Sequence, residues 1–229
     1  MIEAIDLRKV YGKKLALSVD RIRIEAGEFI GLVGNNGAGK TTMLSLILDL
    51  IEPTKGYVTS KSMKVSETDD WKSYTGSYLN EGFLIPFLKP MEFLEFIGSL
   101  HQMNKDDVRA FLFANTSFFD MDTFSGKYNR ELSAGNKNKI GILGSFLAKP
   151  EILILDEPFS NLDPSSQMWL KAKLRELNGE GITILISSHD LKHVTEICSR
   201  ILLLEEGHIL KDTPTDADTL VELEEYFKI

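Results

Sequence analysis

Cysteine is almost absent from this chain of 229 residues, since Cys198 is the only one. A single cysteine excludes an internal disulfide and favours a reducing compartment. Long apolar runs are also missing, because no stretch approaches the roughly 20 apolar residues that span a bilayer. The first residues lack the basic and apolar segments of a signal peptide. The sequence therefore predicts that any membrane role comes through a partner.

Positive charge is in short supply as well. Lys and Arg number 26 against 34 Asp and Glu, so the net charge is −8 and the pI is near 5.1. An acidic chain is poorly suited to the phosphate backbone of nucleic acids, and we expect no nucleic-acid partner. Hydrophobic residues make up 43% of the chain, which is typical of a folded protein. Length and composition fit one α/β domain or a core that carries a subdomain.

The most informative motif is the glycine-rich stretch at residues 34–42, Gly-Asn-Asn-Gly-Ala-Gly-Lys-Thr-Thr. It lies between an apolar strand-like run at 29–33 and a helix-like run at 43–51, which is the context of a phosphate-binding loop rather than of an ordinary turn. Backbone N–H groups of such a loop and the start of the following helix attract phosphate. Lys40 is predicted to reach the β- and γ-phosphates, and the Thr41 hydroxyl is predicted to bind Mg²⁺. The predicted phosphate-binding residues are Gly34, Asn35, Asn36, Gly37, Ala38, Gly39, Lys40, Thr41 and Thr42.

Hydrophobic spacing predicts the other elements of an alternating fold. Strands are expected at 2–7, 21–24, 28–33, 57–59, 152–155 and 182–186, with a hairpin at 201–210. Helices are expected at 43–51, 91–100, 108–113 and 220–227, and through 140–146. Polar residues follow three of these strands, namely Gly34, Asp156 with Glu157, and His189. Because ligands sit beyond the carboxyl ends of strands in open α/β sheets, these three regions are predicted to meet.

The chemistry of these strand ends suits a nucleotide. An acidic pair after a strand is usually a helix cap or a solvated turn, but a phosphate loop upstream favours a metal site. Asp156 is predicted to hold Mg²⁺ opposite Thr41, and Glu157 to orient or deprotonate an attacking water. His189 is predicted to donate a hydrogen bond to the γ-phosphate. The remaining histidines, His101, His193 and His208, have no such context and are interpreted as incidental.

A further motif, Leu132-Ser133-Ala134-Gly135-Asn136, would by itself be only a helix N-cap. Together with the other motifs, in this order, it makes the chain resemble an ATP-binding-cassette (ABC) ATPase, the separate nucleotide-binding subunit of an ABC transporter. The resemblance covers nearly the whole length. It matches Tyr11 to the residue that stacks on adenine, 34–42 to Walker A, Glu81 to the Q-loop, 132–136 to the signature, 152–157 to Walker B, 160–163 to the D-loop and His189 to the switch histidine.

The resemblance implies a recA-like P-loop core with a small antiparallel β subdomain and an inserted α-helical subdomain. It implies one ABC ATPase domain over 1–229, with the core at 1–81 and 146–229 and the helical subdomain at 82–145. It also implies a two-fold dimer of identical chains, in which Ser133 and Gly135 of one copy contact the ATP held by the other. Lys40, Glu157 and His189 are the implied catalytic residues.

Three positions depart from the family pattern: Glu81 replaces a frequent Gln, Ala134 a Gly and Asn136 a Gln. Glu81 can still reach Mg²⁺ and is expected as a ligand with Thr41 and Asp156. Glu at this position also occurs in export-type branches, which favours export. The apolar stretch Phe83–Phe87 either lines a groove for a membrane subunit or packs within the helical subdomain.

The implied function is ATP hydrolysis that powers transport by an integral membrane subunit. The expected location is cytoplasmic, peripheral on the inner face of the cell membrane. The alternative is a non-transport ABC-type switch, such as the ribosome or DNA-repair members. Those members usually join two cassettes or carry long coiled-coil insertions, and this chain shows neither. A cassette that binds without cleaving is disfavoured because the catalytic side chains are all present.

Overall fold

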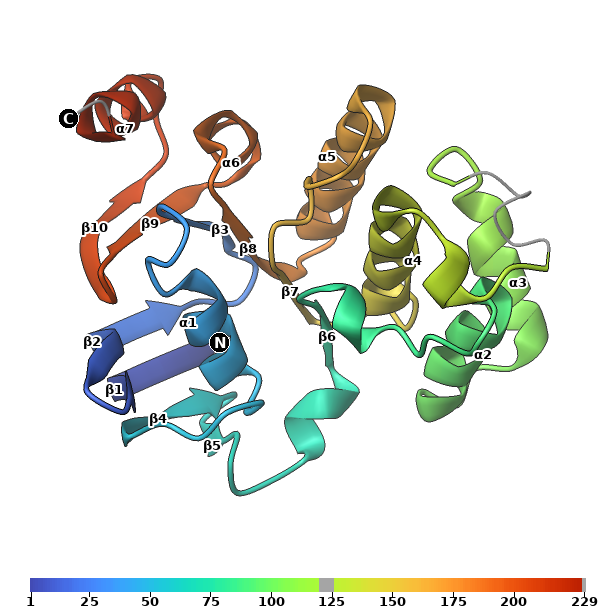
Figure 1. Ribbon diagram of the computed structural model, residues 1–229, viewed down its shortest axis with the longest axis horizontal. Helices are drawn as coiled ribbons and strands as arrows, with labels where there is room; N and C mark the ends of the chain where they lie inside the picture. The colour runs from blue at the N-terminus through green and yellow to red at the C-terminus, as the bar shows by residue number, and fades with distance from the viewer. Residues whose placement is uncertain (120–125, 228–229) are drawn as a thin grey trace.

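Two sheets organise the molecule, and helices cover them (Figure 1). A computed structural model describes residues 1–119 and 126–227. The larger sheet has six strands in the order β10-β9-β3-β8-β7-β6, and the smaller has four in the order β2-β1-β4-β5. The expected α/β class is confirmed.

The six-stranded sheet carries the central strands that the apolar runs predict. Its strands are β3 (Phe29–Val33), β6 (Thr75–Tyr78), β7 (Ile152–Leu155), β8 (Thr183–Ser188), β9 (Arg200–Glu205) and β10 (His208–Pro214). All neighbours pair in parallel except β9 and β10, which form the expected hairpin. Every residue of β3, β7 and β8 is buried, which explains their continuous apolar runs.

The four-stranded sheet is antiparallel, and helix α1 (Lys40–Ile47), which follows the glycine-rich loop, lies between it and the six-stranded sheet. The strands of the four-stranded sheet are β1 (Ile2–Tyr11), β2 (Lys14–Ile24), β4 (Lys55–Ser60) and β5 (Met63–Lys64). One face of this sheet packs with α1 and with Ile30 and Leu32 of the central strand β3 in a single apolar core. The loop that precedes α1 is therefore held between two sheets.

The helices gather around the other face of the larger sheet. They are α2 (Pro90–Leu100), α3 (Lys105–Ala114), α4 (Ala134–Phe146), α5 (Pro164–Gly179), α6 (Leu191–Ile197) and α7 (Thr219–Phe227). Short 3₁₀ helices lie at η1 (Asp70–Ser73), η2 (Glu81–Phe83) and η4 (Asn129–Glu131). Figure 1 shows α2, α3 and α4 together beyond β6 and β7. The ring of Phe118 stacks on Trp169 of α5 with centroids 4.3 Å apart, which joins this helical group to the core.

The predicted elements are confirmed in kind, with shifted ends. Strands β1 and β2 are longer than predicted, and α1 begins three residues earlier than the apolar run, directly on Lys40. Helices α5 and α6 and strand β6 were not predicted. The sequence of β6, Thr-Gly-Ser-Tyr, has little apolar pattern because the strand lies at the sheet edge and three of its residues are only partly buried. Part of the predicted helical subdomain, residues 120–125, falls outside the described residues.

Across the described ranges, no helix combines the length and apolar character that crossing a bilayer requires.

Candidate functional site

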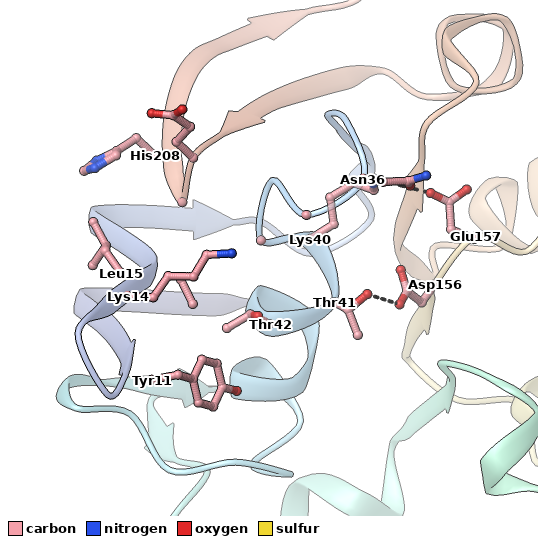
Figure 2. A pocket seen from close by; sticks show the side chains of 15 residues that line it. Tyr11, Lys14, Leu15, Asn36, Lys40, Thr41, Thr42, Asp156, Glu157 and His208 are labelled. Atoms are coloured by element: carbon pink, nitrogen blue, oxygen red, sulfur yellow. Dashed lines mark hydrogen bonds and ion pairs between the residues drawn. The ribbon is translucent and has the colours of Figure 1, made fainter.

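The three predicted strand ends do meet. Strands β3, β8 and β7 are neighbours, with Val33 opposite Ser188 and Leu155 opposite Ile186. The residues that follow β3 and β7 open onto a cavity of about 730 Å³, whereas His189 after β8 contacts Glu157 and lines a neighbouring hollow. Figure 2 shows Lys40, Thr41, Asp156 and Glu157 pointing into the same space from different elements. Its lining is Tyr11, Lys14, Leu15, Ala16, Asn36, Gly37, Gly39, Lys40, Thr41, Thr42, Asp156, Glu157, Glu206, Gly207 and His208.

The loop at residues 34–39 has a backbone that only glycine accommodates at key positions. Gly39, the residue before α1, has a φ of 112°, and a Cβ there would lie 2.6 Å from the carbonyl oxygen of Ala16. Gly34 has a φ of 158°, and its Cβ would lie 2.2 Å from the carbonyl oxygen of Leu204. The two glycines therefore allow the loop to pass between β2 and β9, so that the first N–H groups of α1 face the cavity.

The side chain of Lys40 folds back over the loop and bonds to the loop's backbone. Its Nζ donates to the carbonyl oxygen of Gly34 at 2.7 Å and lies 3.5 Å from Oε1 of Glu157. The residue is only 6% exposed, so its ammonium group is confined to the cavity. A confined cation at the positive end of a helix is a strong attractor for phosphate.

Asp156 is the buried carboxylate of the site, at 8% exposed. Its Oδ2 accepts a hydrogen bond from the Thr41 hydroxyl at 2.6 Å, and its Oδ1 accepts one from the Ser187 hydroxyl. Ser187 is also the acceptor for the backbone N–H of Glu157, at 2.9 Å. Ser187 was not singled out from the sequence, although its place two residues before His189 at the end of β8 is a usable signal. It fixes the carboxylate that faces Thr41.

Glu157 stands on a strained backbone at the mouth of the cavity. Its φ is 48°, a left-handed conformation that is uncommon outside glycine and is concentrated at functional sites. Its Oε2 is 2.8 Å from Nδ1 of His189, and it also accepts from the His189 backbone N–H at 3.3 Å. The carboxylate thus lies between a histidine and the ammonium of Lys40.

The outer wall includes residues that the sequence reading missed. The turn at Glu206 and Gly207 lies against the loop, since Gly207 N–H donates to the carbonyl oxygen of Ala38 at 2.8 Å. His208 follows that turn and lines the cavity, although it was interpreted as incidental. Tyr11 lies at the far end, half exposed, with the Nζ of Lys9 5.0 Å from its ring centroid. Only the packing of the β9–β10 hairpin on the loop brings His208 here.

The predicted signature residues lie outside this cavity. Ser133 caps α4 by accepting from the Asn136 N–H at 3.3 Å, and a Cβ on Gly135 would lie 2.5 Å from the carbonyl oxygen of Asn161. The side chain of Asn138 donates to the carbonyl oxygens of Pro158, at 3.1 Å, and Ser160, at 2.7 Å. The start of α4 is therefore fixed to the segment that follows Glu157, and not to the cavity of the same chain.

The D-loop segment ends in a helix cap. Asp163 accepts the N–H of Ser166 at 2.9 Å and hydrogen bonds from the hydroxyls of Ser165 and Ser166, which lower the pKa of its carboxyl. Lys139 of α4 pairs with the same carboxylate at 3.2 Å.

Glu81 also lies away from the cavity lining. Its Oε2 is 3.0 Å from the Nζ of Lys137 on α4. Its role as a metal ligand stays a prediction.

A magnesium ion would find oxygen ligands here but no complete protein cage. In the part of the chain that the structure describes, no group of three or more His, Cys, Asp or Glu side chains is arranged to hold a metal. Mg²⁺ usually binds one or two carboxylates together with substrate phosphates. The Thr41 hydroxyl and the Asp156 carboxylate, 2.6 Å apart beside the phosphate loop, fit that pattern.

Comparisons with known proteins agree with this geometry. A family model described as "ABC transporter" matches residues 17–160. An uncharacterized ABC transporter ATP-binding protein of Alkalihalophilus pseudofirmus is 37% identical over 198 residues, covering 86% of this chain and 71% of the relative. The linearmycin resistance ATP-binding protein LnrL of Bacillus subtilis is 29% identical over 231 residues, covering 97% of this chain and 74% of the relative.

The fold has a solved counterpart. The dimeric structure of MJ0796, described as a bacterial ABC transporter cassette, superposes with a TM-score of 0.85 at 25% identity. The superposition covers 95% of this chain and all of that one. The expected recA-like core with its small antiparallel sheet and helical segment is confirmed.

Proposed function

This chain belongs to the ABC transporter family of ATP-binding cassettes, and from that premise we propose that it hydrolyses ATP as a homodimer to drive export by an integral membrane subunit. The observation that carries the proposal is the cavity at the ends of β3 and β7, which brings together a phosphate loop, the buried cation of Lys40, the buried carboxylate of Asp156 and the more exposed carboxylate of Glu157. ATP and Mg²⁺ are the proposed ligands.

The binding residues follow from the cavity's two ends. The loop at 34–42 and the ammonium of Lys40 would bind the phosphates through N–H groups and charge. The Tyr11 ring, half exposed at the opposite end, would stack on adenine. Magnesium, held by Thr41 and Asp156, would neutralise charge on the β- and γ-phosphates.

The hydrolytic residues stand at the phosphate end. Glu157 would orient the attacking water and accept its proton as the bond to the γ-phosphorus forms, while the bond to the β–γ bridging oxygen breaks and ADP leaves. The His189 imidazole, 2.8 Å from Oε2 of Glu157, would hold this carboxylate and donate a hydrogen bond to the γ-phosphate. The backbone strain at Glu157 aims the carboxylate into the cavity.

A second copy would complete the site. Ser133 and Gly135 do not line the cavity of their own chain, so their proposed contact with the γ-phosphate requires the facing subunit. A two-fold interface of this kind forms two such sites together. Closure on ATP and reopening after hydrolysis would then transmit force to the membrane partner.

The partner would dock beside the helical segment, which we propose as a subdomain over 82–145 set against a core at 1–81 and 146–229. Phe83, Ile85 and Phe87 are exposed in the loop after Glu81, at 44%, 37% and 66%. Phe83 also lines a groove of about 230 Å³ with Tyr78. Exposed aromatic side chains beside a groove suit a helix from a membrane subunit.

Two observations support export over import. Glu81 matches the export-type branches, and the relative LnrL is named for resistance to linearmycin. The proposed location follows from the partner: the inner face of the cell membrane, on the cytoplasmic side.

The catalytic test uses Glu157→Gln, which removes the charge and keeps the shape. We expect Mg-ATP binding to persist, ATP-dependent dimers to accumulate in light scattering, and turnover to fall by about 10²-fold or more. Wild-type specific activity should rise with protein concentration, because each site needs two chains. Undiminished hydrolysis in the Glu157→Gln variant would contradict the assigned role.

The partner test uses Phe83→Asp with Phe87→Asp. Charged side chains in the docking loop should abolish stimulation of the ATPase by the membrane subunit and leave the activity of the isolated cassette in place. The control is Met168→Asp, an apolar position on α5 that is more exposed than either phenylalanine. Full stimulation of the double variant would show that the loop only packs within the helical subdomain. Copurification of a multi-span membrane protein from detergent-solubilised membranes identifies the partner; salt-sensitive nucleic-acid binding would instead support a non-transport switch.

A further inference from the structure

An ion pair joins two segments on which the proposed ATP cycle depends. The Glu81 carboxylate lies 3.0 Å from the ammonium of Lys137. Glu81 opens the 3₁₀ helix η2, and Lys137 lies in the first turn of α4, where its N–H donates to the carbonyl oxygen of Ser133 at 2.9 Å. The pair therefore fixes the position of η2 relative to the start of the signature helix.

Lys137 is the cation of α4 that faces this carboxylate. The other lysine of the same turn, Lys139, pairs instead with Asp163 at 3.2 Å. The Lys137 side chain is 22% exposed and the Glu81 side chain is 60% exposed. Glu81 can therefore leave the pair into solvent without breaking any buried packing.

The ion pair holds the Glu81 carboxylate against helix α4 and away from the cavity. Thr41 and Asp156 line the cavity, whereas Glu81 does not. A neutral glutamine at this position would be attracted to Lys137 far less, because an ion pair adds Coulomb attraction to the hydrogen bond. Glu81 can therefore approach a magnesium nucleotide only after it separates from Lys137.

We propose that Lys137 is a positioning residue that holds the Glu81 carboxylate outside the nucleotide cavity, so that binding of magnesium and ATP must break this ion pair. This inference rests on the proposed Mg-ATP site and on the prediction that Glu81 is a further ligand of its magnesium.

The expected effect is small and measurable. Partly exposed pairs of this kind shift equilibria by about two- to fivefold, and salt screens them. Removing the Lys137 charge should therefore tighten magnesium-dependent ATP binding by about two- to fivefold at low ionic strength. The gain should shrink toward unity at high ionic strength.

The experiment measures ATP affinity by titration calorimetry, with Mg²⁺ and with EDTA, in the Glu157→Gln background, where turnover is blocked. The quantity compared is the ATP affinity with Mg²⁺ divided by the ATP affinity with EDTA. A general folding defect changes both affinities by the same factor and leaves this ratio unchanged. Lys137→Met should raise this ratio, and Lys137→Arg should keep the value of the parent. Lys173→Met is the matched control, since that lysine also makes an exposed ion pair, with Glu176 on α5 at 2.6 Å.

A double-mutant cycle with Glu81→Gln isolates the pair. In the Glu81→Gln background, Lys137→Met should leave the ratio unchanged. Normal magnesium-dependent ATP binding that is insensitive to Lys137, or an equal effect of Lys137→Met without Glu81, overturns this inference and leaves the proposed function standing. If the Glu157→Gln parent fails to bind ATP under all of these conditions, the inference and the proposed function are both wrong.

Discussion

Replacing Asn138 by Ala should loosen the attachment of the signature helix to the segment after Glu157. The Asn138 side chain is buried, at 7% exposed, and its Nδ2 donates to the carbonyl oxygens of Pro158 and Ser160. These two hydrogen bonds join residues about twenty positions apart in the chain. Among the residues that the structure describes, no other donor bonds to either carbonyl oxygen.

The magnitude follows from the lost partners. Leaving buried polar groups without a hydrogen bond costs about 1–3 kcal/mol. Alanine has a higher helix propensity than asparagine, which offsets up to about 0.7 kcal/mol. We therefore expect Asn138→Ala to lower the free energy of unfolding by about 1–2 kcal/mol. For a domain of this size that corresponds to a fall in Tm of roughly 2–8 °C.

The control is Asn136→Ala, two residues earlier on the same helix. Its backbone N–H bonds to Ser133, and its side chain makes none of the contacts that Asn138 makes. Asn136→Ala gains the same helix propensity but loses no buried hydrogen bond. Its free energy of unfolding should therefore stay the same or rise by a few tenths of a kcal/mol. Thermal and urea denaturation followed by circular dichroism measure both variants. Equal stability of Asn138→Ala and Asn136→Ala would refute the reasoning.

Three other changes test separate parts of the structure. Gly39→Ala should abolish ATP binding in a calorimetric titration, because its φ of 112° is strained for alanine and the new Cβ meets the carbonyl oxygen of Ala16 at 2.6 Å; retained affinity would contradict this. Tyr11→Ala should weaken ATP binding by about tenfold through lost base stacking, and Tyr11→Phe should not, as measured with a fluorescent nucleotide. Asp163→Ala should lower Tm by roughly 2–4 °C, because it removes the N-cap of α5; an unchanged Tm would show that the cap is dispensable.

Local sequence accounts for much of the nucleotide site. A phosphate loop is built from consecutive residues, so the run from Gly34 to Thr42 could be recognised without knowing the fold. Strands β3, β7 and β8 were recognisable because burial on both faces leaves continuous apolar runs. Because the carboxyl ends of parallel strands share one edge of a sheet, the sequence also predicted that Asp156 and His189 lie near the loop.

Other elements were not predicted. Helix α5 was missed although its sequence carries usable signals: Asp163 is its cap, Pro164 lies in its first turn, and the buried residues Leu170, Leu174 and Leu177 have helical spacing. Strand β6 was missed because it lies at the sheet edge and only the last of its four residues is fully buried, so its sequence shows little apolar pattern. Such a strand owes its structure to neighbours that are distant in the chain.

The amino-acid order by itself determined the family, the phosphate loop and the carboxylates at the strand ends, since each depends on residues that are adjacent or alternate along the chain. Tertiary structure alone decided which distant side chains meet. It placed His208 on the cavity wall, put Ser187 against Asp156, and paired Glu81 with Lys137 instead of with the cavity. The physical reason is that hydrogen bonds and ion pairs act over a few ångströms, and only packing of the sheets and helices brings residues so far apart in the chain within that range.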